Sequence, residues 1–341
     1  MKILSNQIYD NYLYNKEIKD RFINIVTKNS SENTVVAYKR ILSRVSILEK
    51  RYEKDLFDFT TQEVEQFLIK LNPTSLNSAI QSISLIDNYI KWALGEHLSK
   101  GSMNPLDIFT TAEFAERVVN KRVKNIFTYD EINEVIVDTV NFQDSALVLS
   151  LFFGIMGKQF SEISNLRIQD IGKEQNIINL KGLESERSIK LETEEQLELI
   201  DLLEMAHEQN EYIKNNGVAN KIKNPRMPLV RNDYVFRPMS RVRTTGDHPT
   251  TASYFVLRNR IVTLSEAFDK PSFTAINIRN SGMLYMAYQE YKNNGEELTK
   301  ASRRKIYEFY NMQKSKNRDD FYSHIYEREF LNVETIRELY Y

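Results

Sequence analysis

Helix-start signals recur along this chain, and most of its periodic apolar stripes follow one of them. Ser31 precedes a stripe with a 3.6-residue period, Thr60 and Glu63 have the spacing of a capping box, and Ser75 follows Pro73 before a third stripe. Before Ser31, residues 1–28 fit an extra helical arm whose apolar face would consist of Ile8, Leu13, Ile18, Phe22 and Ile25. The N-terminal third is therefore predicted to be helical.

The chain breaks at Lys100-Gly101-Ser102 and again at Asn104-Pro105, which is typical of a domain edge. A length of 341 residues also favours two domains. We predict a helical domain over residues 1–110, a basic helical linker over 111–125 and a second domain over 126–341.

The second domain begins with another capping box, Thr128 to Glu131, and continues with an apolar helix around residues 146–156. Residues 178–191 alternate in polarity on both sides of a turn at 182–186, which predicts a β-hairpin. The expected fold class is mainly α with a small β-sheet or hairpin.

Composition argues against metal chemistry and against a membrane span. The chain has no cysteine, and its four histidines, at positions 97, 207, 248 and 324, show no ligand spacing. The longest apolar run, residues 146–156, is too short to cross a bilayer, and the first residues do not resemble a signal peptide. We expect a soluble cytoplasmic protein without a metal or cofactor.

The formal net charge of −1 hides an uneven distribution of charge. Residues 126–213 carry 6 basic and 18 acidic side chains, whereas residues 214–260 carry 10 basic and 2 acidic ones. The basic block precedes and enters a predicted helix over residues 251–268. We expect a basic loop that clamps phosphates and a helix that enters a DNA groove, with Arg241, Arg243, Arg258 and Arg260 as contacts. The alternative, a solubilising loop, would not need this excess of positive charge.

The helix predicted after Ser75 has two different faces. Its apolar face consists of Leu76, Ile80, Ile83, Ile86 and Ile90. Its polar face consists of Asn77, Gln81, Ser84, Asn88 and Lys91. Amides, a hydroxyl and an ammonium group suit contacts with base edges and phosphates, although a solvated helix face is the more common reason for such a stripe. Weaker phosphate-binding candidates on the preceding helix are Lys39, Arg40 and Arg44.

The stretch FFGIMGKQFSEISNLRIQD, residues 152–170, resembles the first catalytic box of the tyrosine recombinases, or phage integrases, T-G-L-R-x-S-E-L-x-x-L-x-x-x-D-I. Residues 161–163 match S-E-L, and Gln159 stands where the family has its first catalytic arginine. The region from Ser31 through Trp92 to Asn104-Pro105 resembles the SAM-like core-binding domain of the same family. The resemblance implies a SAM-like N-terminal domain and an integrase-like second domain.

The remaining boxes resemble the family only in part. Lys181 takes the place of the hairpin lysine, and Arg279 matches the arginine of H-x-L-R-H-S/T. Ile276 and Asn280 replace the two histidines of that box. Tyr322 is placed at the nucleophile position, with Tyr326 as a competing choice and Gln313 where a later histidine would be.

In this family a tyrosine attacks a DNA phosphate, two arginines and a histidine bind the developing charge, and a lysine protonates the leaving oxygen. The loss of one preorganised charge-binding donor costs about 10²–10³ in rate. Here an arginine and up to three imidazoles are missing, so we expect no enzyme activity and vestigial positions at Gln159, Lys181, Ile276, Arg279 and Tyr322. Binding to DNA is spread over many phosphate contacts and would survive.

The chain also resembles the recombinase-like master repressors of SPβ-type Bacillus prophages. This implies a sequence-specific binder of double-stranded DNA that represses transcription and maintains lysogeny in the bacterial cytoplasm, at the nucleoid. The implied partners are operator DNA, a second copy of the chain and an antirepressor protein. The predicted DNA contacts are Lys39, Arg40, Arg44, Asn77, Gln81, Asn88, Lys91, Lys181, Arg241, Arg243, Arg258, Arg260 and Arg279.

Two other functions remain open. One is a divergent active recombinase that cleaves DNA through Tyr322 or Tyr326, with Lys158 or Arg167 in place of the lost arginine. The other is an accessory protein without specific DNA binding, against which the basic block and the polar stripe argue. The tail, residues 330–341, has two alternatives as well: it packs on a neighbouring copy or folds back on its own domain.

Overall fold

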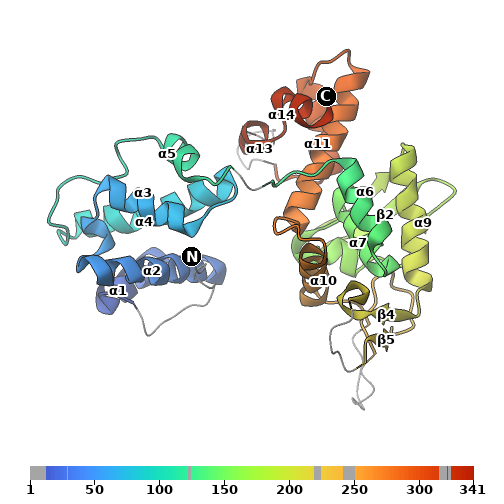
Figure 1. The fold of residues 1–341 in the computed structure, drawn as a ribbon, viewed down its shortest axis with the longest axis horizontal. Helices are drawn as coiled ribbons and strands as arrows, with labels where there is room; N and C mark the ends of the chain where they lie inside the picture. The colour runs from blue at the N-terminus through green and yellow to red at the C-terminus, as the bar shows by residue number, and fades with distance from the viewer. Residues whose placement is uncertain are drawn as a thin grey trace. The chain divides into compact units, whose positions relative to one another are not determined.

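The structure is a computed structural model that describes residues 13–28, 30–121, 124–218, 224–240, 250–314, 321 and 324–341 (Figure 1). The chain divides into two compact units, residues 1–123 and 124–341, which are described separately. No helix in the described residues is long and apolar enough to cross a membrane.

The N-terminal unit is helical. Its elements are α1 (Lys16–Val26), α2 (Glu32–Tyr52), the 3₁₀ turn η2 (Leu56–Asp58), α3 (Thr61–Leu71), α4 (Leu76–Gly95) and α5 (Thr111–Val118). The predicted starts are confirmed, because the side chains of Ser31, Thr60 and Ser75 each accept a hydrogen bond from a backbone N–H in the first turn of α2, α3 and α4.

The predicted apolar face of the first helix packs in the core of this unit at Leu13, Ile18 and Phe22, but not at Ile25. Lys19, Phe22 and Ile23 are buried, whereas Ile25 is 54% exposed. The prediction was wrong for Ile25 because Lys19, Phe22 and Ile23, at positions i, i+3 and i+4, form the buried face of α1. Residue 25 then points to solvent. Ile8 lies outside the described residues.

Lys19 is buried because α1 contributes it to an ionic cluster inside this unit. Its Nζ lies 2.8 Å from Glu49 Oε1 and 3.3 Å from Asp55 Oδ2. Tyr89 of α4 donates a hydrogen bond to Asp55 Oδ1 at 2.9 Å. The cluster therefore joins α1, α2 and α4.

The segment expected to be a linker, 111–125, contains helix α5. Phe114, Ala115 and Val118 of α5 are buried in the core of the N-terminal unit. The first part of the segment therefore belongs to that unit, since three apolar side chains on one face of α5 pack against the core.

The C-terminal unit begins with α6 (Tyr129–Asp138) and α7 (Phe142–Phe152). Helix α7 is buried along almost its whole length and packs against α6, α9 and α11. The turns η3 (Lys158–Phe160), α8 (Ser161–Ser164) and η4 (Ile168–Asp170) lead from it into the sheet. An apolar helix in this place was predicted, and its burial makes it the centre of the domain (Figure 1).

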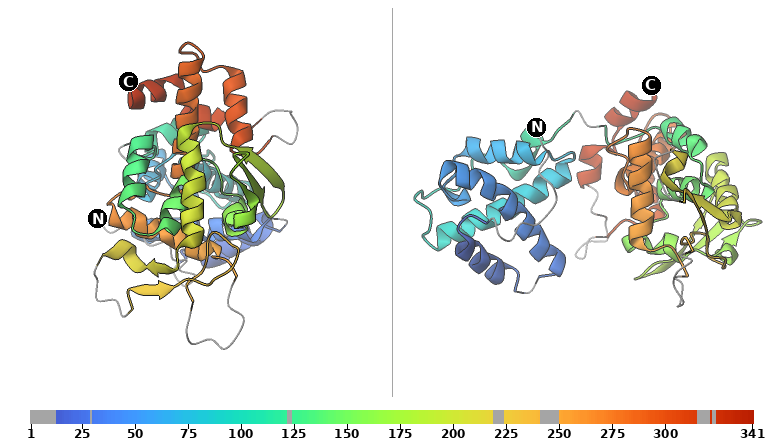
Figure 2. Two further views of the ribbon diagram at one scale, coloured as in Figure 1. Left: turned by 90° about the vertical axis from the view of Figure 1, so that its right-hand side faces the viewer. Right: turned by 60° about the horizontal axis from the view of Figure 1, so that its bottom comes forward.

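A three-stranded antiparallel sheet contains β1 (Ile171–Gly172), β2 (Ile177–Lys181) and β3 (Glu186–Lys190), in that order. Ile178 pairs with Ile189, which confirms the predicted hairpin. Helix α9 (Glu194–Glu208) follows and packs on α7 (Figure 2). A two-stranded sheet contains β4 (Glu211–Ile213) and β5 (Arg226–Pro228), with η5 (Lys214–Gly217) after β4.

The last elements are α10 (Tyr254–Ala267), α11 (Ala275–Asn293), α12 (Lys300–Phe309), α13 (His324–Glu329) and α14 (Val333–Tyr340). Helix α14 folds back on α11 of the same chain, where the rings of Tyr288 and Tyr340 stack with centroids 4.3 Å apart. Arg337 Nε also donates a hydrogen bond to the Tyr291 hydroxyl at 3.2 Å. The predicted fold class, mainly α with small antiparallel sheets, is confirmed.

Candidate functional site

Helix α4 presents the predicted polar stripe to solvent. Asn77, Gln81, Ser84, Asn88 and Lys91 are all exposed, while Ile83, Ile86 and Ile90 on the opposite face are buried. The prediction of two faces is therefore confirmed.

Two side chains at the C-terminal end of this stripe are held in place. Asn88 Nδ2 donates a hydrogen bond to the Tyr38 hydroxyl of α2 at 3.0 Å. Lys91 Nζ donates a hydrogen bond to Asp87 Oδ2 at 2.9 Å, and this bond raises the pKa of Lys91. Asp87 is itself fixed by Asn104 Nδ2 at 2.6 Å. This part of the stripe is therefore preorganised.

The predicted cations of α2 differ in their exposure. Arg40 is exposed, and Lys39 is half-buried. Burial lowers the pKa of Arg44, whose Nε has no hydrogen-bond partner among the described residues. Arg40 is thus the most accessible of the three.

Helix α10 carries an outward stripe and an inward arginine. Phe255, Arg258, Asn259 and Val262 are exposed and lie at i, i+3, i+4 and i+7, so they share one face. Arg260 was predicted to contact DNA, and this was wrong. Its side chain is buried, with Nη1 donating to Gln143 Oε1 at 2.9 Å, because residue 260 falls on the core side of the helix.

A small polar cavity of about 270 Å³ lies where the recombinase-like boxes meet, and we call it the box cavity. Its walls come from Gly154, residues 156–158, Glu162, the hairpin tip 182–185, Tyr310, Asn311 and Arg279 of α11. Burial lowers the pKa of Arg279, and its Nε has no hydrogen-bond partner among the described residues. Its Nη2 donates to Asn280 Oδ1 at 3.1 Å, and its guanidinium also hydrogen-bonds to Tyr326.

The one acidic side chain buried at the box cavity is already neutralised. Glu162 accepts hydrogen bonds from Arg187 Nε at 2.7 Å and Nη2 at 3.0 Å. Arg187 also donates to the carbonyl oxygens of Phe309 and Gly154. Arg279 is therefore left as a half-buried cation without a carboxylate partner in the described part of the chain.

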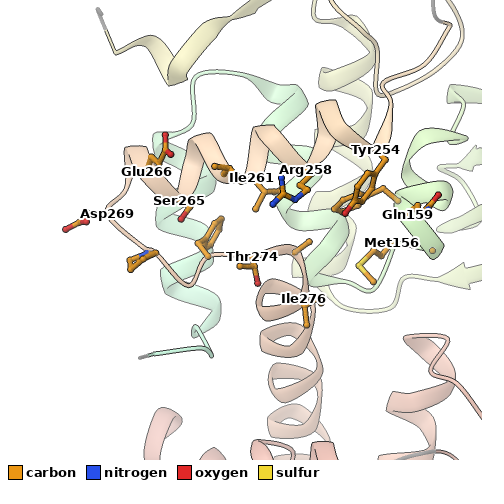
Figure 3. Close-up of a pocket in the computed structure, with 16 residues that line it drawn as sticks. Met156, Gln159, Tyr254, Arg258, Ile261, Ser265, Glu266, Asp269, Thr274 and Ile276 are labelled. Atoms are coloured by element: carbon orange, nitrogen blue, oxygen red, sulfur yellow. The ribbon is translucent and has the colours of Figure 1, made fainter. Parts of the chain in front are cut away.

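The other vestigial positions that the structure describes do not line the box cavity. Gln159, with a positive φ of 56°, and Ile276 line a neighbouring apolar groove beside α10, which shares Met156 and Gly157 with the box cavity (Figure 3). Lys181 is exposed, with Nζ 3.9 Å from Asp170 Oδ1, and does not line the box cavity. Of the vestigial residues that the structure describes, only Arg279 lines this cavity.

Of the two tyrosines considered for the nucleophile position, Tyr326 of α13 contacts Arg279. Tyr322, Arg241 and Arg243 lie outside the described residues. Gln313, expected at a histidine position, is exposed.

Sequence reasoning did not identify Arg187 as part of the site. A signal was present, because residues 187 and 189 point to the same side of β3 and the apolar Ile189 belongs to the alternating pattern of the predicted hairpin. The groove beside α10 had no sequence signal, since helix and loop residues far apart in the chain form it. No group of three potential metal ligands occurs among the residues described here.

Two family models match this chain. The model described as the MrpR C-terminal catalytic domain matches residues 126–341, and the one described as the MrpR N-terminal core-binding domain matches residues 13–96. The SPbeta prophage-derived uncharacterized protein YopR of Bacillus subtilis (strain 168) is 30% identical over 334 residues, which cover 96% of this chain and 97% of that protein.

Solved structures of recombinases are similar as well. A lambda integrase tetramer bound to a Holliday junction is 12% identical, with a TM-score of 0.50, over 90% of this chain and 76% of the integrase chain. XerA recombinase is 17% identical, with a TM-score of 0.41, over 95% of this chain and 97% of that chain. At these identities the lambda integrase likeness shows the fold alone.

Proposed function

This chain belongs to the MrpR family of tyrosine-recombinase-like proteins, and from that premise we propose that it binds double-stranded DNA at specific sites without cutting it. Its role is that of a prophage repressor, which maintains lysogeny by occupying operators. The site of action is the nucleoid in the host cytoplasm.

The polar stripe of α4 is the observation that carries this proposal. Asn77, Gln81, Asn88 and Lys91 are exposed on one face of a two-domain recombinase fold. An α-helix fits the major groove of B-DNA, where amide side chains distinguish adenine by paired hydrogen bonds. The hydrogen bonds that fix Asn88 and Lys91 lower the entropy lost on binding.

The outward stripe of α10 supports a second contact with the duplex. Arg258 and Asn259 suit guanine and adenine edges, and the apolar Phe255 and Val262 suit thymine methyl groups. Arg258 replaces Arg260 as the DNA contact from this helix.

Phosphate contacts supply the remaining affinity. The exposed cations Arg40, Lys91 and Lys181, together with Lys39 and Arg44, are proposed to contact the backbone. Arg241 and Arg243, outside the described residues, keep the same proposed role. Arg279 is proposed to hold one phosphate at the box cavity, because it is a half-buried cation that lacks a carboxylate partner there.

The proposed lack of chemistry follows from the charges at the box cavity. A tyrosine attack on phosphate needs several preorganised donors around the oxygens, and each absent donor costs about 10²–10³ in rate. Gln159 and Ile276 carry no charge, and Lys181 lies beside Asp170 instead of Arg279. Occupancy of DNA is then the only effect that such a protein exerts.

The relationship to an SPbeta prophage protein supports the assignment to a prophage, and the tetrameric lambda integrase supports self-association on DNA. A repressor also needs a means of release, for which an antirepressor protein is proposed.

A second function has one observation in its favour. Tyr326 hydrogen-bonds to Arg279, as a nucleophile beside its charge-binding arginine would. A divergent recombinase that uses Tyr326 or Tyr322 would use Lys158 or Arg167 in place of the missing arginine. Lysine lacks the bidentate fork of arginine, and Lys158 is paired with Glu184 at 2.5 Å, so the first function is preferred.

The test is a gel-shift titration with fragments of the source genome at two salt concentrations, with part of each sample denatured. A specific, salt-sensitive complex that disappears on denaturation supports a binder without chemistry. An adduct that survives denaturation identifies an enzyme. Gln81→Ala is expected to weaken specific binding by roughly five- to a hundredfold, whereas Gln62→Ala, an exposed glutamine on α3, is expected to change nothing.

A further inference from the structure

The apolar groove beside α10, which we call the α10 groove, has a volume of about 750 Å³. Loop 156–160, helix α10 and residues 269–276 form it (Figure 3). Three apolar side chains that line it remain open to solvent: Ile276 is 57% exposed, Val262 40% and Tyr254 37%. An apolar surface of this kind, rimmed by charge, marks an interaction site.

The charges of the rim are separated by sign. Glu266 and Asp269 lie at one end of the groove, and Arg258 lies nearer its middle, with Tyr254 between Arg258 and Gln159 (Figure 3). All three charged side chains are exposed, and none forms an ion pair within the described part of the chain. Glu266 lies eight positions after Arg258 on α10, which corresponds to roughly 12 Å along the helix.

Duplex DNA does not account for this composition. A phosphate backbone gains nothing from the apolar side chains of Ile276 and Tyr254, which have no part in the proposed DNA contacts, and Glu266 and Asp269 repel it. Where the recombinase-like boxes would place a guanidinium and an imidazole, this chain has Gln159 and Ile276, and both line the groove. These two replacements remove groups that bind phosphate and leave an amphipathic hollow.

We propose that the α10 groove is the docking site for an amphipathic segment of a partner protein. Apolar side chains of the segment lie on Ile276, Val262 and Tyr254. An acidic residue of the segment pairs with Arg258, and a basic residue about 12 Å away pairs with Glu266 and Asp269. A small molecule fits less well, because ligand pockets usually bury most of the ligand and this floor stays open.

The partner and DNA compete for the same helix. This step rests on the proposed function, in which Arg258 contacts DNA from the outward face of α10. A segment that pairs with Arg258 and covers Val262 removes two of the four side chains of that face. Docking at the groove therefore releases DNA, which is the chemistry expected of an antirepressor.

The experiment selects short peptides from a random display library against the full chain without DNA. The selected peptides are then measured by fluorescence anisotropy on the wild type and on Ile276→Asn, Val262→Asn and Arg258→Gln. Val137→Asn serves as the matched control, because Val137 is an exposed valine on α6 that does not line the groove. Circular dichroism melting verifies that each variant is folded.

The expected peptides have an apolar centre with one acidic and one basic residue. Each groove variant is expected to weaken them by about tenfold or more, and the control is expected to leave them unchanged. Peptides that bind all variants equally would overturn the proposal, and so would a library that yields no binder. Ile276→Asn and Val262→Asn test the apolar floor independently. If one of them does not fold, the other still provides the test.

A second arm separates this proposal from the proposed function. The best peptide is added to a complex of the chain with a labelled genomic fragment from the gel shift. Displacement of the DNA is expected. Peptides that need the groove residues but leave the DNA complex intact would refute the competition. If such peptides bind but the chain binds no DNA, the proposed function is refuted and the docking site stands.

Discussion

Arg260 and Asp144 form a buried ion pair in which Arg260 Nε lies 3.7 Å from Asp144 Oδ1. Arg260 Nη2 also donates a hydrogen bond to the Arg237 carbonyl at 3.0 Å, so the guanidinium joins α10 to α7 and to the segment before α10. Two residues earlier, Arg258 is exposed. Arg258 and Arg260 therefore have the same charge, but Arg258 faces solvent and Arg260 lies in the core.

Alanine substitutions should separate these roles. Arg260→Ala leaves Asp144 buried without its cation, and we expect the free energy of unfolding to fall by about 3–5 kcal/mol. Arg258→Ala should leave stability within about 0.5 kcal/mol and weaken specific DNA binding by roughly fivefold or more. Urea unfolding followed by circular dichroism and fluorescence anisotropy with labelled DNA measure the two effects. Wild-type stability in Arg260→Ala would contradict the structural role.

Gly282 marks the closest approach of α11 to α7. A Cβ at this position would lie 1.7 Å from the Phe152 carbonyl oxygen and 2.6 Å from the Tyr310 hydroxyl. The Tyr310 hydroxyl donates a hydrogen bond to the Phe152 carbonyl oxygen at 2.7 Å. Neither group can move away from the added methyl group without breaking this bond. We expect Gly282→Ala to destabilise the chain by about 3 kcal/mol or more, measured by chemical unfolding.

Gly95, the last residue of α4, is the matched control for Gly282. No heavy atom lies within 4 Å of a Cβ built there. Gly95→Ala should leave the chain as stable as the wild type or more stable by roughly 0.5–1 kcal/mol, since alanine loses less backbone entropy in a helix. Equal losses in the two variants would count against the tight crossing of α7 and α11.

The local elements could be predicted because their causes are local. Thr60 and Glu63, or Thr128 and Glu131, satisfy the free N–H groups of a helix start within four residues of sequence. The polar stripe of α4 followed from helical periodicity alone. These features need no knowledge of what packs against them.

The environment of single charged residues could not be predicted in the same way. Arg260 was assigned to DNA because its charge is evident from the sequence. Its contact with Asp144, more than 100 positions away, is not. Which of the vestigial side chains line the box cavity likewise depends on how loop 156–160 packs against α10 and α11. Tertiary contacts decide whether a cation is a structural or a binding group.

Glu49 gives the chain a pH-dependent stability. Burial and the charge of Asp55 raise its pKa, while the charge of Lys19 opposes the rise, and the result is a pKa of about 8. Tyr89 and the backbone N–H of Leu56 also face this cluster. An acid whose pKa is raised on folding holds its proton more tightly in the folded state, so its contribution is complete below its unfolded pKa and is lost as the pH rises through about 8.

We therefore expect the wild type to lose stability relative to Glu49→Gln as the pH rises from about 5 to about 8. Glutamine is neutral at every pH and imitates the protonated acid. Denaturant titrations at several pH values measure the difference. Glu96→Gln, which removes an exposed carboxylate 3.1 Å from Arg21, is the control and should run parallel to the wild type. A constant difference for Glu49→Gln would show that Glu49 is ionised throughout this range.

Restoring the missing family residues should not restore strand cleavage. In the double variant Gln159→Arg with Ile276→His, Lys181 still lies beside Asp170, and Asn280 and Gln313 still replace imidazoles. The added arginine should strengthen DNA binding, because it adds one cation near the DNA backbone. The slope of the logarithm of the binding constant against the logarithm of the salt concentration should become steeper by about one. Binding titrations at several salt concentrations and denaturing gels with nicked DNA measure both results. A covalent adduct that forms in the double variant and is absent when Tyr326→Phe is added would show instead that Tyr326 and Arg279 remain a working pair, and that only two residues separate this chain from a recombinase.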